Sequence, residues 1–157
     1  MKVILLSVGK TDDSHFVQLI EEYWKRVNFY ITFEMIIVPD LKNRKSMSEK
    51  EQKTGECNLL LKSLQPGDRI VLLDDKGKHY TSVEFARYME KKTHTVPRRL
   101  VFIIGGPYGF SEDIYNAAHE KISLSKMTFT HQMVRLVFAE QLYRSMTILH
   151  NEPYHHE

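Results

Sequence analysis

Residues 100–110 read Leu-Val-Phe-Ile-Ile-Gly-Gly-Pro-Tyr-Gly-Phe, an apolar strand that leads directly into a glycine loop. Glycines at positions 105, 106 and 109 let the backbone approach a ligand closely and adopt positive φ angles. The loop has neither the GxGxxG spacing of a dinucleotide site nor the GK[ST] sequence of a phosphate-binding loop. It therefore indicates a ligand site of another kind, or a tight strand-to-helix turn that needs glycine for its geometry alone.

Strand-like and helical segments alternate along the rest of the chain. We expect strands at residues 3–8, 31–38, 69–74 and 100–104, and a shorter one near 122–124, with turns at 66–67 and 75–77 bounding the third. Near-continuous apolar runs are typical of strands covered on both faces. The pattern predicts an α/β fold with a mostly parallel sheet flanked by helices. No linker or repeat interrupts residues 1–157, so we predict one domain.

The composition is that of an ordinary globular protein. No apolar run reaches the length of a membrane span, and the net charge of +2 only weakly favours an anionic partner. A single cysteine, Cys57, excludes an internal disulfide and a multi-thiolate metal site. We therefore expect a cytoplasmic protein.

Three loops are placed to bind a ligand, because ligands of open α/β sheets lie beyond the carboxyl ends of the strands. They are residues 73–75, the glycine loop and residues 124–129. The last of these mixes hydroxyl and apolar side chains, which suits an adenine-like ring. An ordinary connection with a Ser or Thr helix cap explains the same residues nearly as well.

The last predicted helix, residues 130–149, is apolar around most of its circumference. Such a helix is buried on more than one side, which favours a homodimer interface over a central helix in a monomer. Glu140 and Arg144 have the i, i+4 spacing of a helix salt bridge. Alternatively, Arg144 binds a phosphate and Glu140 orients it.

The C-terminal tail carries His150, Tyr154, His155 and His156. Histidine titrates near neutrality, so a terminal histidine is suited to act as a general base or to contact an RNA base. A frayed polar tail is the alternative. The spacing matches no strong ligand pattern, so we predict no metal, although a metal-dependent hydrolase using these histidines is a rival function.

Taken together, these segments resemble the RlmH family, SPOUT-class methyltransferases that modify N3 of a pseudouridine in large-subunit (23S) ribosomal RNA. The resemblance covers the full length. It is carried by Leu72-Leu73-Asp74, residues 104–110, residues 124–131, residues 140–144 and Pro153-Tyr154-His155. The family implies a C-terminal trefoil knot, a homodimer with its site near the subunit interface, and assembled ribosomes as substrate. A non-catalytic ribosome- or RNA-binding protein of the same fold is the alternative.

The resemblance also implies roles for particular residues. S-adenosylmethionine would be held in the knot by Leu73, Gly105, Leu124, Ser125, Lys126, Met127, Thr128 and Phe129. We expect His155 to act as a base or to stabilise an anion, Tyr154 to position the target base, and Arg144 to hold RNA phosphate. One residue departs from the family, whose tail commonly continues with Arg or Lys after Tyr-His. Here His156 replaces that fixed cation with a side chain that titrates.

Overall fold

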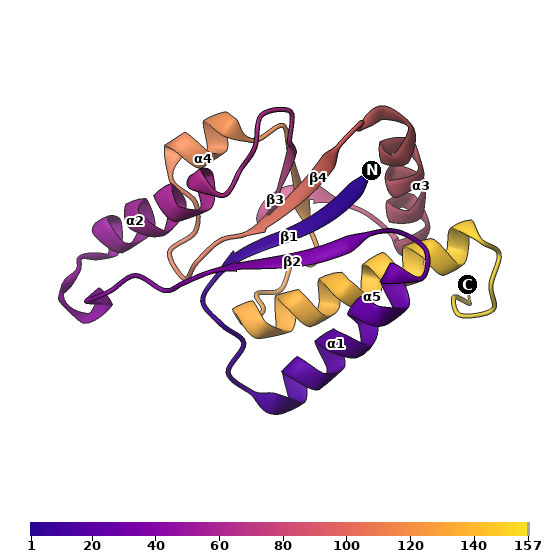
Figure 1. Ribbon diagram of the computed structural model, residues 1–157, viewed down its shortest axis with the longest axis horizontal. Helices are drawn as coiled ribbons and strands as arrows, with labels where there is room; N and C mark the ends of the chain where they lie inside the picture. The colour runs from indigo at the N-terminus through magenta and orange to yellow at the C-terminus, as the bar shows by residue number, and fades with distance from the viewer. Residues whose placement is uncertain (157) are drawn as a thin grey trace.

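The computed structural model describes residues 1–156, which form a five-stranded parallel sheet between two helical layers (Figure 1). The strands lie in the order β2-β1-β4-β3-β5. Their bounds are β1 (Lys2–Val8), β2 (Phe33–Val38), β3 (Arg69–His79), β4 (Arg99–Ile104) and β5 (Glu120–Ser123). The helices are α1 (Ser14–Asn28), η1 (Arg44–Ser46), α2 (Glu49–Lys62), α3 (Ser82–Thr95), α4 (Glu112–Ala117) and α5 (His131–Leu149). The predicted α/β fold with a parallel sheet is confirmed.

Two hydrophobic cores lie on opposite faces of the sheet, because alternate side chains of each strand point to opposite sides. In β1, Val3 and Leu5 pack under α1, α3 and α5, whereas Ile4 and Leu6 pack under α2 and α4. The same alternation in β3 and β4 explains why these strands read as continuous apolar runs. It also places Leu73 on the α5 side of the sheet.

Hydroxyl side chains cap the amino-terminal ends of α2, α3 and α5. The side chain of Ser48 caps α2 and that of Thr81 caps α3, each in a reciprocal capping box with the glutamate three residues later. Thr130 caps α5 by accepting a hydrogen bond from the N–H of Met133. Among residues 1–156, none of the helices combines the length and the apolar content that a bilayer crossing requires.

The third strand is longer than predicted. Residues 75–77 do not end it in a turn; β3 continues to His79, and its register on β5 shifts so that Leu73 and Lys78 both pair with Ile122. Gly77 sits inside this irregularity, where an added Cβ would lie 2.5 Å from the carbonyl carbon of Ile122. The glycine that predicts a turn is therefore needed for close backbone approach within the sheet.

The second strand is shorter than predicted and begins at Phe33. The preceding residues turn instead, because the side-chain amide of Asn28 accepts from the N–H of Phe33 and donates to its carbonyl oxygen. The amides of Tyr30 and Ile31 both donate to the carbonyl oxygen of Val27. These bonds hold residues 28–32 as a cap between α1 and β2 rather than as strand.

A buried arginine joins α5 to the sheet. Arg135 is only 2% exposed and donates to the carbonyl oxygens of Val8 and Gly9, at 2.9 and 2.7 Å, and to the hydroxyl of Thr11, at 2.8 Å. Burial lowers the pKa of its guanidinium. One turn earlier, the side chain of Gln132 accepts from the N–H of Asp13. The first turns of α5 are thereby fixed to the loop that follows β1.

We expect Gly77→Ala to lower the free energy of unfolding by about 2 kcal/mol, because the new methyl group must displace the backbone of β5. Urea denaturation followed by circular dichroism measures the change. Lys76→Ala is the matched control, since Lys76 is exposed in the same irregular segment and should leave the midpoint nearly unchanged. Equal midpoints for Gly77→Ala and the wild type would contradict the close approach of β3 and β5.

Candidate functional site

A cavity of about 150 Å³ lies beside the middle of β3 and the carboxyl end of β5, next to the start of α5. Its walls are Leu73, Asp74, Asp75, Ser123, Leu124, Ser125, Met127, Thr128, Phe129 and Val134. Six of the predicted cofactor residues are therefore brought together: Leu73, Leu124, Ser125, Met127, Thr128 and Phe129. Two others, Gly105 and Lys126, are not among the lining residues.

The loop between β5 and α5 is shaped by its own serines. The hydroxyl of Ser123 donates to the carbonyl oxygen of Ser125, at 2.8 Å, and the hydroxyl of Ser125 accepts from the N–H of Met127, at 2.9 Å. Met127 is 78% exposed at the mouth of the cavity. The loop is thus an ordered connection with a Thr cap, and at the same time one wall of a cavity.

The chemistry of the cavity suits S-adenosylmethionine. Leucine, valine and phenylalanine side chains offer apolar faces to a heterocyclic ring, and serine and threonine hydroxyls offer hydrogen bonds. The volume is below the range typical of whole ligands, so the cavity can take the base of the cofactor alone. Its two charged residues, Asp74 and Asp75, are acidic, which suits a positively charged sulfur.

Helix α2 supports the glycine loop from behind. The carboxyl of Glu56, only 3% exposed, occupies the space where a side chain on Gly106 would stand, because an added Cβ would lie 2.0 Å from its Oε2 atom. The thiol sulfur of Cys57 accepts from the N–H of Ser111 at 3.2 Å. Gly105 directly follows Ile104, which pairs with Leu73. Glycine is therefore needed here for close packing beside the cavity.

Asp74 is anchored at the cavity wall by two hydrogen bonds. Its carboxylate accepts from the Tyr115 hydroxyl of α4 at 2.5 Å and from the N–H of Lys76 at 2.8 Å. Burial raises the pKa of this carboxyl, but these bonds and the nearby Lys121 together hold it below its usual value. Burial and Asp74 raise the pKa of Tyr115 to about 12. At neutral pH the pair is a carboxylate bonded by a neutral phenol.

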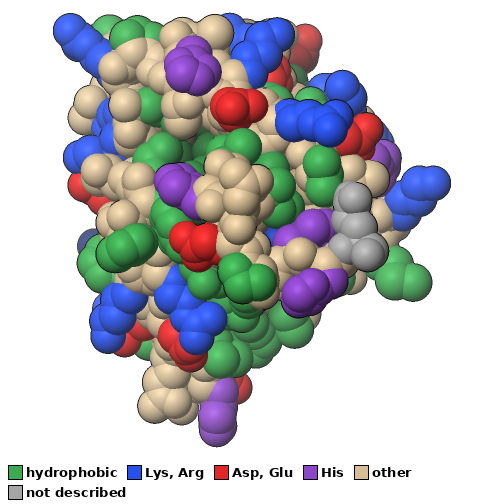
Figure 2. Space-filling view, turned by 90° about the vertical axis from the view of Figure 1, so that its right-hand side faces the viewer, with side chains coloured by type: hydrophobic (Ala, Val, Ile, Leu, Met, Phe, Trp, Pro, Cys, Tyr) green, Lys and Arg blue, Asp and Glu red, His purple; other side chains and the backbone are tan. Residues whose placement is uncertain are grey.

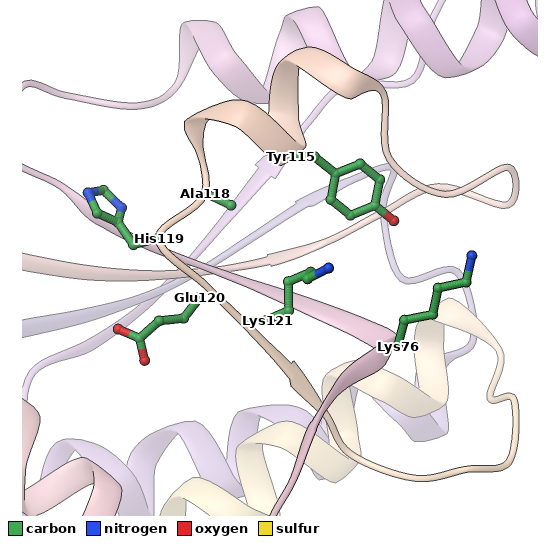
Figure 3. A pocket seen from close by; sticks show the side chains of 6 residues that line it. All are labelled: Lys76, Tyr115, Ala118, His119, Glu120 and Lys121. Atoms are coloured by element: carbon green, nitrogen blue, oxygen red, sulfur yellow. The ribbon is translucent and has the colours of Figure 1, made fainter.

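A larger hollow of about 560 Å³ lies on the outer side of β5 (Figure 3). Its lining is Lys76, Tyr115, Ala118, His119, Glu120 and Lys121, with the ammonium of Lys121 5.4 Å from the centre of the Tyr115 ring. None of the predicted site residues lies in it. Tyr115 therefore stands between this hollow and the carboxylate of Asp74.

Glu140, in the middle of α5, holds the tail. Its Oε1 atom accepts from two nitrogens of Arg144, at 3.1 and 2.6 Å, and from the Tyr154 hydroxyl, at 3.0 Å. The Arg144 guanidinium also lies over the Tyr154 ring, 4.7 Å from its centre. The i, i+4 salt bridge is thus confirmed, and the three residues form one cluster. The tail is docked rather than frayed.

His155 belongs to the same cluster. Its Nδ1 atom lies 3.3 Å from a terminal nitrogen of Arg144. A guanidinium can only donate, so Nδ1 is the acceptor and the ring hydrogen of a neutral His155 is on Nε2. Burial, Tyr23 and Glu140 raise the pKa of Tyr154 well above its usual value. The cluster therefore presents hydrogen-bond donors near neutral pH.

The two groups of predicted site residues lie at different points along α5. Val134 lines the cavity, and the tail contacts Glu140 and Arg144, six and ten residues further along the helix, or about 9 and 15 Å. Figure 1 shows the tail at the end of the molecule where β1 begins, opposite the carboxyl ends of the strands. Figure 2 looks onto that end, where histidine, basic and hydrophobic side chains lie close together. One chain thus separates its cavity from its tail.

Three residues near the site were missed by sequence reasoning. Glu56 gives no signal, because a glutamate in a polar helix reads as solvated surface. Arg135 likewise resembles an exposed helix residue. Tyr23, whose hydroxyl lies 3.4 Å from that of Tyr154, reads as core spacing in α1. Among residues 1–156, no group of three or more His, Cys, Asp or Glu side chains is placed to hold a metal ion.

Comparison with known proteins gives a consistent result. The model of a family described as predicted SPOUT methyltransferase matches residues 1–155. A Parabacteroides distasonis protein named Ribosomal RNA large subunit methyltransferase H is 64% identical over 157 residues, covering 100% of both chains. Proteins of the same name from Bacteroides fragilis and Flavobacterium johnsoniae are 58% and 53% identical, again over 100% of each chain.

A solved structure supports the fold. The probable methyltransferase of Bordetella pertussis Tohama I superposes with a TM-score of 0.53, covering 92% of this chain and 96% of that chain at 10% identity. A likeness at this identity concerns the fold alone. The expected SPOUT-type architecture is confirmed, and the trefoil knot stays a prediction.

We expect Glu140→Ala to release the tail, because it removes the acceptor shared by Arg144 and Tyr154. Hydrogen–deuterium exchange of the peptide covering residues 150–156 should become at least about tenfold faster, while exchange within the sheet stays unchanged. Glu22→Ala is the control, since it removes an exposed i, i+4 pair with Arg26 on α1. Unchanged tail exchange in Glu140→Ala would contradict docking through Glu140.

Proposed function

We propose a function from the premise that this chain belongs to the SPOUT methyltransferase family. It transfers a methyl group from S-adenosylmethionine to N3 of a pseudouridine in large-subunit ribosomal RNA. The name of its full-length relatives, Ribosomal RNA large subunit methyltransferase H, supports the class of acceptor. The nucleotide and the atom follow from the resemblance carried by the motif residues.

One observation of the structure carries the proposal. Residues 73–75 within β3 and the loop of residues 124–129 come together beside the glycine loop that follows β4, and the first two segments form a cavity with apolar, hydroxyl and acidic walls. Leu73 and Phe129 would pack on the base, and the backbone of residues 124–129 would hydrogen-bond to its edge. The bound cofactor supplies a methyl group already activated on a sulfonium sulfur. This chain then mainly has to align an acceptor nitrogen with it.

The acceptor nitrogen needs help because an imide is a poor nucleophile while it carries its proton. As the proton leaves, negative charge develops on the two flanking carbonyl oxygens. In this structure the Tyr154 hydroxyl donates to Glu140 and the Nε2 atom of His155 is buried, so both side chains would turn toward the substrate to stabilise such charge by donating hydrogen bonds. The geometry thus favours His155 as an anion-stabilising donor over its use as a base, because Arg144 already donates to Nδ1. Arg144 also supplies a fixed positive charge beside the substrate.

A homodimer brings these donors to the cofactor. Within one chain the donors lie against the second half of α5 and the cavity lies at its first turn, and a two-fold axis crossing α5 would place the tail of one subunit beside the cavity of the other. Met133, Val137 and Ile148 are half-buried and share the face of α5 that also carries Glu140 and Arg144. This apolar face supports burial against the same face of a second copy.

The substrate form is the assembled ribosome, and the location is the cytoplasm. The net charge of +2 provides little nonspecific electrostatic affinity for protein-free RNA. A small enzyme of this charge gains specificity by shape when the target nucleotide is presented on a folded particle. Both statements rest on the family resemblance and on this charge balance.

We expect transfer of labelled methyl from S-adenosylmethionine to large-subunit RNA in assembled ribosomes from a strain that lacks this gene. His155→Ala should lower turnover by about 100-fold, the effect of losing one preorganised donor, with unchanged cofactor affinity. Free large subunits serve as the comparison substrate. A non-catalytic binding protein would bind ribosomes without transferring label, and normal turnover in His155→Ala would exclude a catalytic role for this histidine.

Mixing two inactive variants tests the shared site. His155→Ala lacks the tail donor, and Leu124→Arg fills the cavity. If each site combines one subunit's cavity with the other's tail, random re-association should restore about a quarter of the wild-type turnover, because only mixed dimers hold one intact site. Each variant re-associated with itself is the control. No recovery, with mixed dimers demonstrated by mass spectrometry, would place the cavity and the tail of a working site in the same subunit.

A further inference from the structure

The cavity is lined by two carboxylates and by none of the described lysine or arginine side chains. This charge has a consequence for the two states of the cofactor. When the methyl carbon bonds to the acceptor nitrogen, the electrons of the broken carbon–sulfur bond stay on sulfur, and the imide proton goes to solvent. The sulfur therefore changes from a positively charged sulfonium to a neutral thioether. Substrate and product differ at this atom by one methyl group and one charge.

Asp74 is the better placed of the two acids. It directly follows Leu73, the last residue of β3 that pairs with β4. Its carboxylate accepts hydrogen bonds from the Tyr115 hydroxyl and the Lys76 amide. These bonds fix the position of the charge, while Asp75 is exposed. A fixed charge on the wall of a partly enclosed cavity is screened less than one on open surface.

A second acidic side chain lies behind the glycine loop. Glu56 is 3% exposed, and its Oε1 atom accepts from the side chain of Gln52 at 2.9 Å. Its Oε2 atom has no hydrogen-bond partner among residues 1–156 and points at the backbone of Gly106. A carboxyl buried with one neutral partner is costly unless a positive group comes near. Glu56 therefore supports the glycine loop from α2 and does not line the cavity, so Asp74 and Asp75 are its acidic wall.

We propose that Asp74 makes this site discriminate between cofactor and spent cofactor by charge, favouring the sulfonium and releasing the neutral thioether. The inference rests on the proposed function and adds to it the cause of product release. Coulomb attraction to Asp74 acts on S-adenosylmethionine and disappears once the methyl group has left. The adenosine and amino-acid parts are the same in both molecules, so contacts to those parts cannot discriminate between them.

Lys121 opposes this attraction. It is exposed on β5, and its positive charge acts on the Asp74 carboxyl. Figure 3 shows Tyr115 and Lys121 among the residues that line the hollow beside β5. The Tyr115 hydroxyl donates to the Asp74 carboxylate. Removing the lysine charge should therefore strengthen the discrimination that removing the Asp74 charge weakens.

Calorimetric titration of the purified protein with S-adenosylmethionine and with S-adenosylhomocysteine tests the proposal. The quantity of interest is the Kd for the homocysteine form divided by the Kd for the methionine form. Asp74→Asn should lower this ratio about fivefold, since it removes one partly screened charge interaction. Asp113→Asn is the matched control, because it removes an exposed carboxylate of α4 that does not line the cavity. It should leave the ratio unchanged.

Lys121→Gln is the second variant, on an exposed side chain that folding does not depend on. It should raise the ratio about twofold. An equal loss of affinity for both ligands in Asp74→Asn would reduce Asp74 to a structural role and overturn the proposal. A lowered ratio in Lys121→Gln would also overturn it. A wild type that binds neither ligand would instead overturn the proposed function itself.

Discussion

The guanidinium of Arg135 determines where α5 begins. It is buried and bonded to the end of β1 and the following loop, and the cofactor-facing loop ends only five residues before it. A charge in this position is costly to bury and is kept there by three hydrogen bonds. If these bonds were lost, the start of α5 and the wall of the cavity would be free to move relative to the sheet. The site is therefore only as rigid as this contact.

The same helix separates the two halves of the chemistry. Its first turn lies by the apolar and acidic cavity, and its last turn leads to a tail clamped by Glu140. In the proposed homodimer, a small chain builds a complete site from two copies without an additional domain, and oligomerisation is then part of catalysis rather than of stability alone.

The parts of this structure that are predictable from sequence are those with a local signal. Apolar runs predict the strands, and the caps at Ser48, Thr81 and Thr130 are signals of the same local kind, because a cap depends on residues close in sequence. The prediction of a turn at Gly77 was wrong, because the sequence does not distinguish a glycine needed for a turn from one needed for close approach of two backbones. The role of Glu56 depends on Gly106, 50 positions away, which no local pattern contains. The six cavity residues came from family resemblance, as spacing alone left an ordinary connection equally possible.

The length of α5 constrains how this gene can change. Side chains along the helix are free to vary where they face solvent, but a single inserted or deleted codon would rotate everything after it by about 100° and shift it by about 1.5 Å. In the proposed dimer, the tail of one subunit would then meet the cavity of the other subunit at the wrong angle. Divergence within this protein should therefore proceed by substitution in α5, and changes of length should gather in loops such as the one that follows β2.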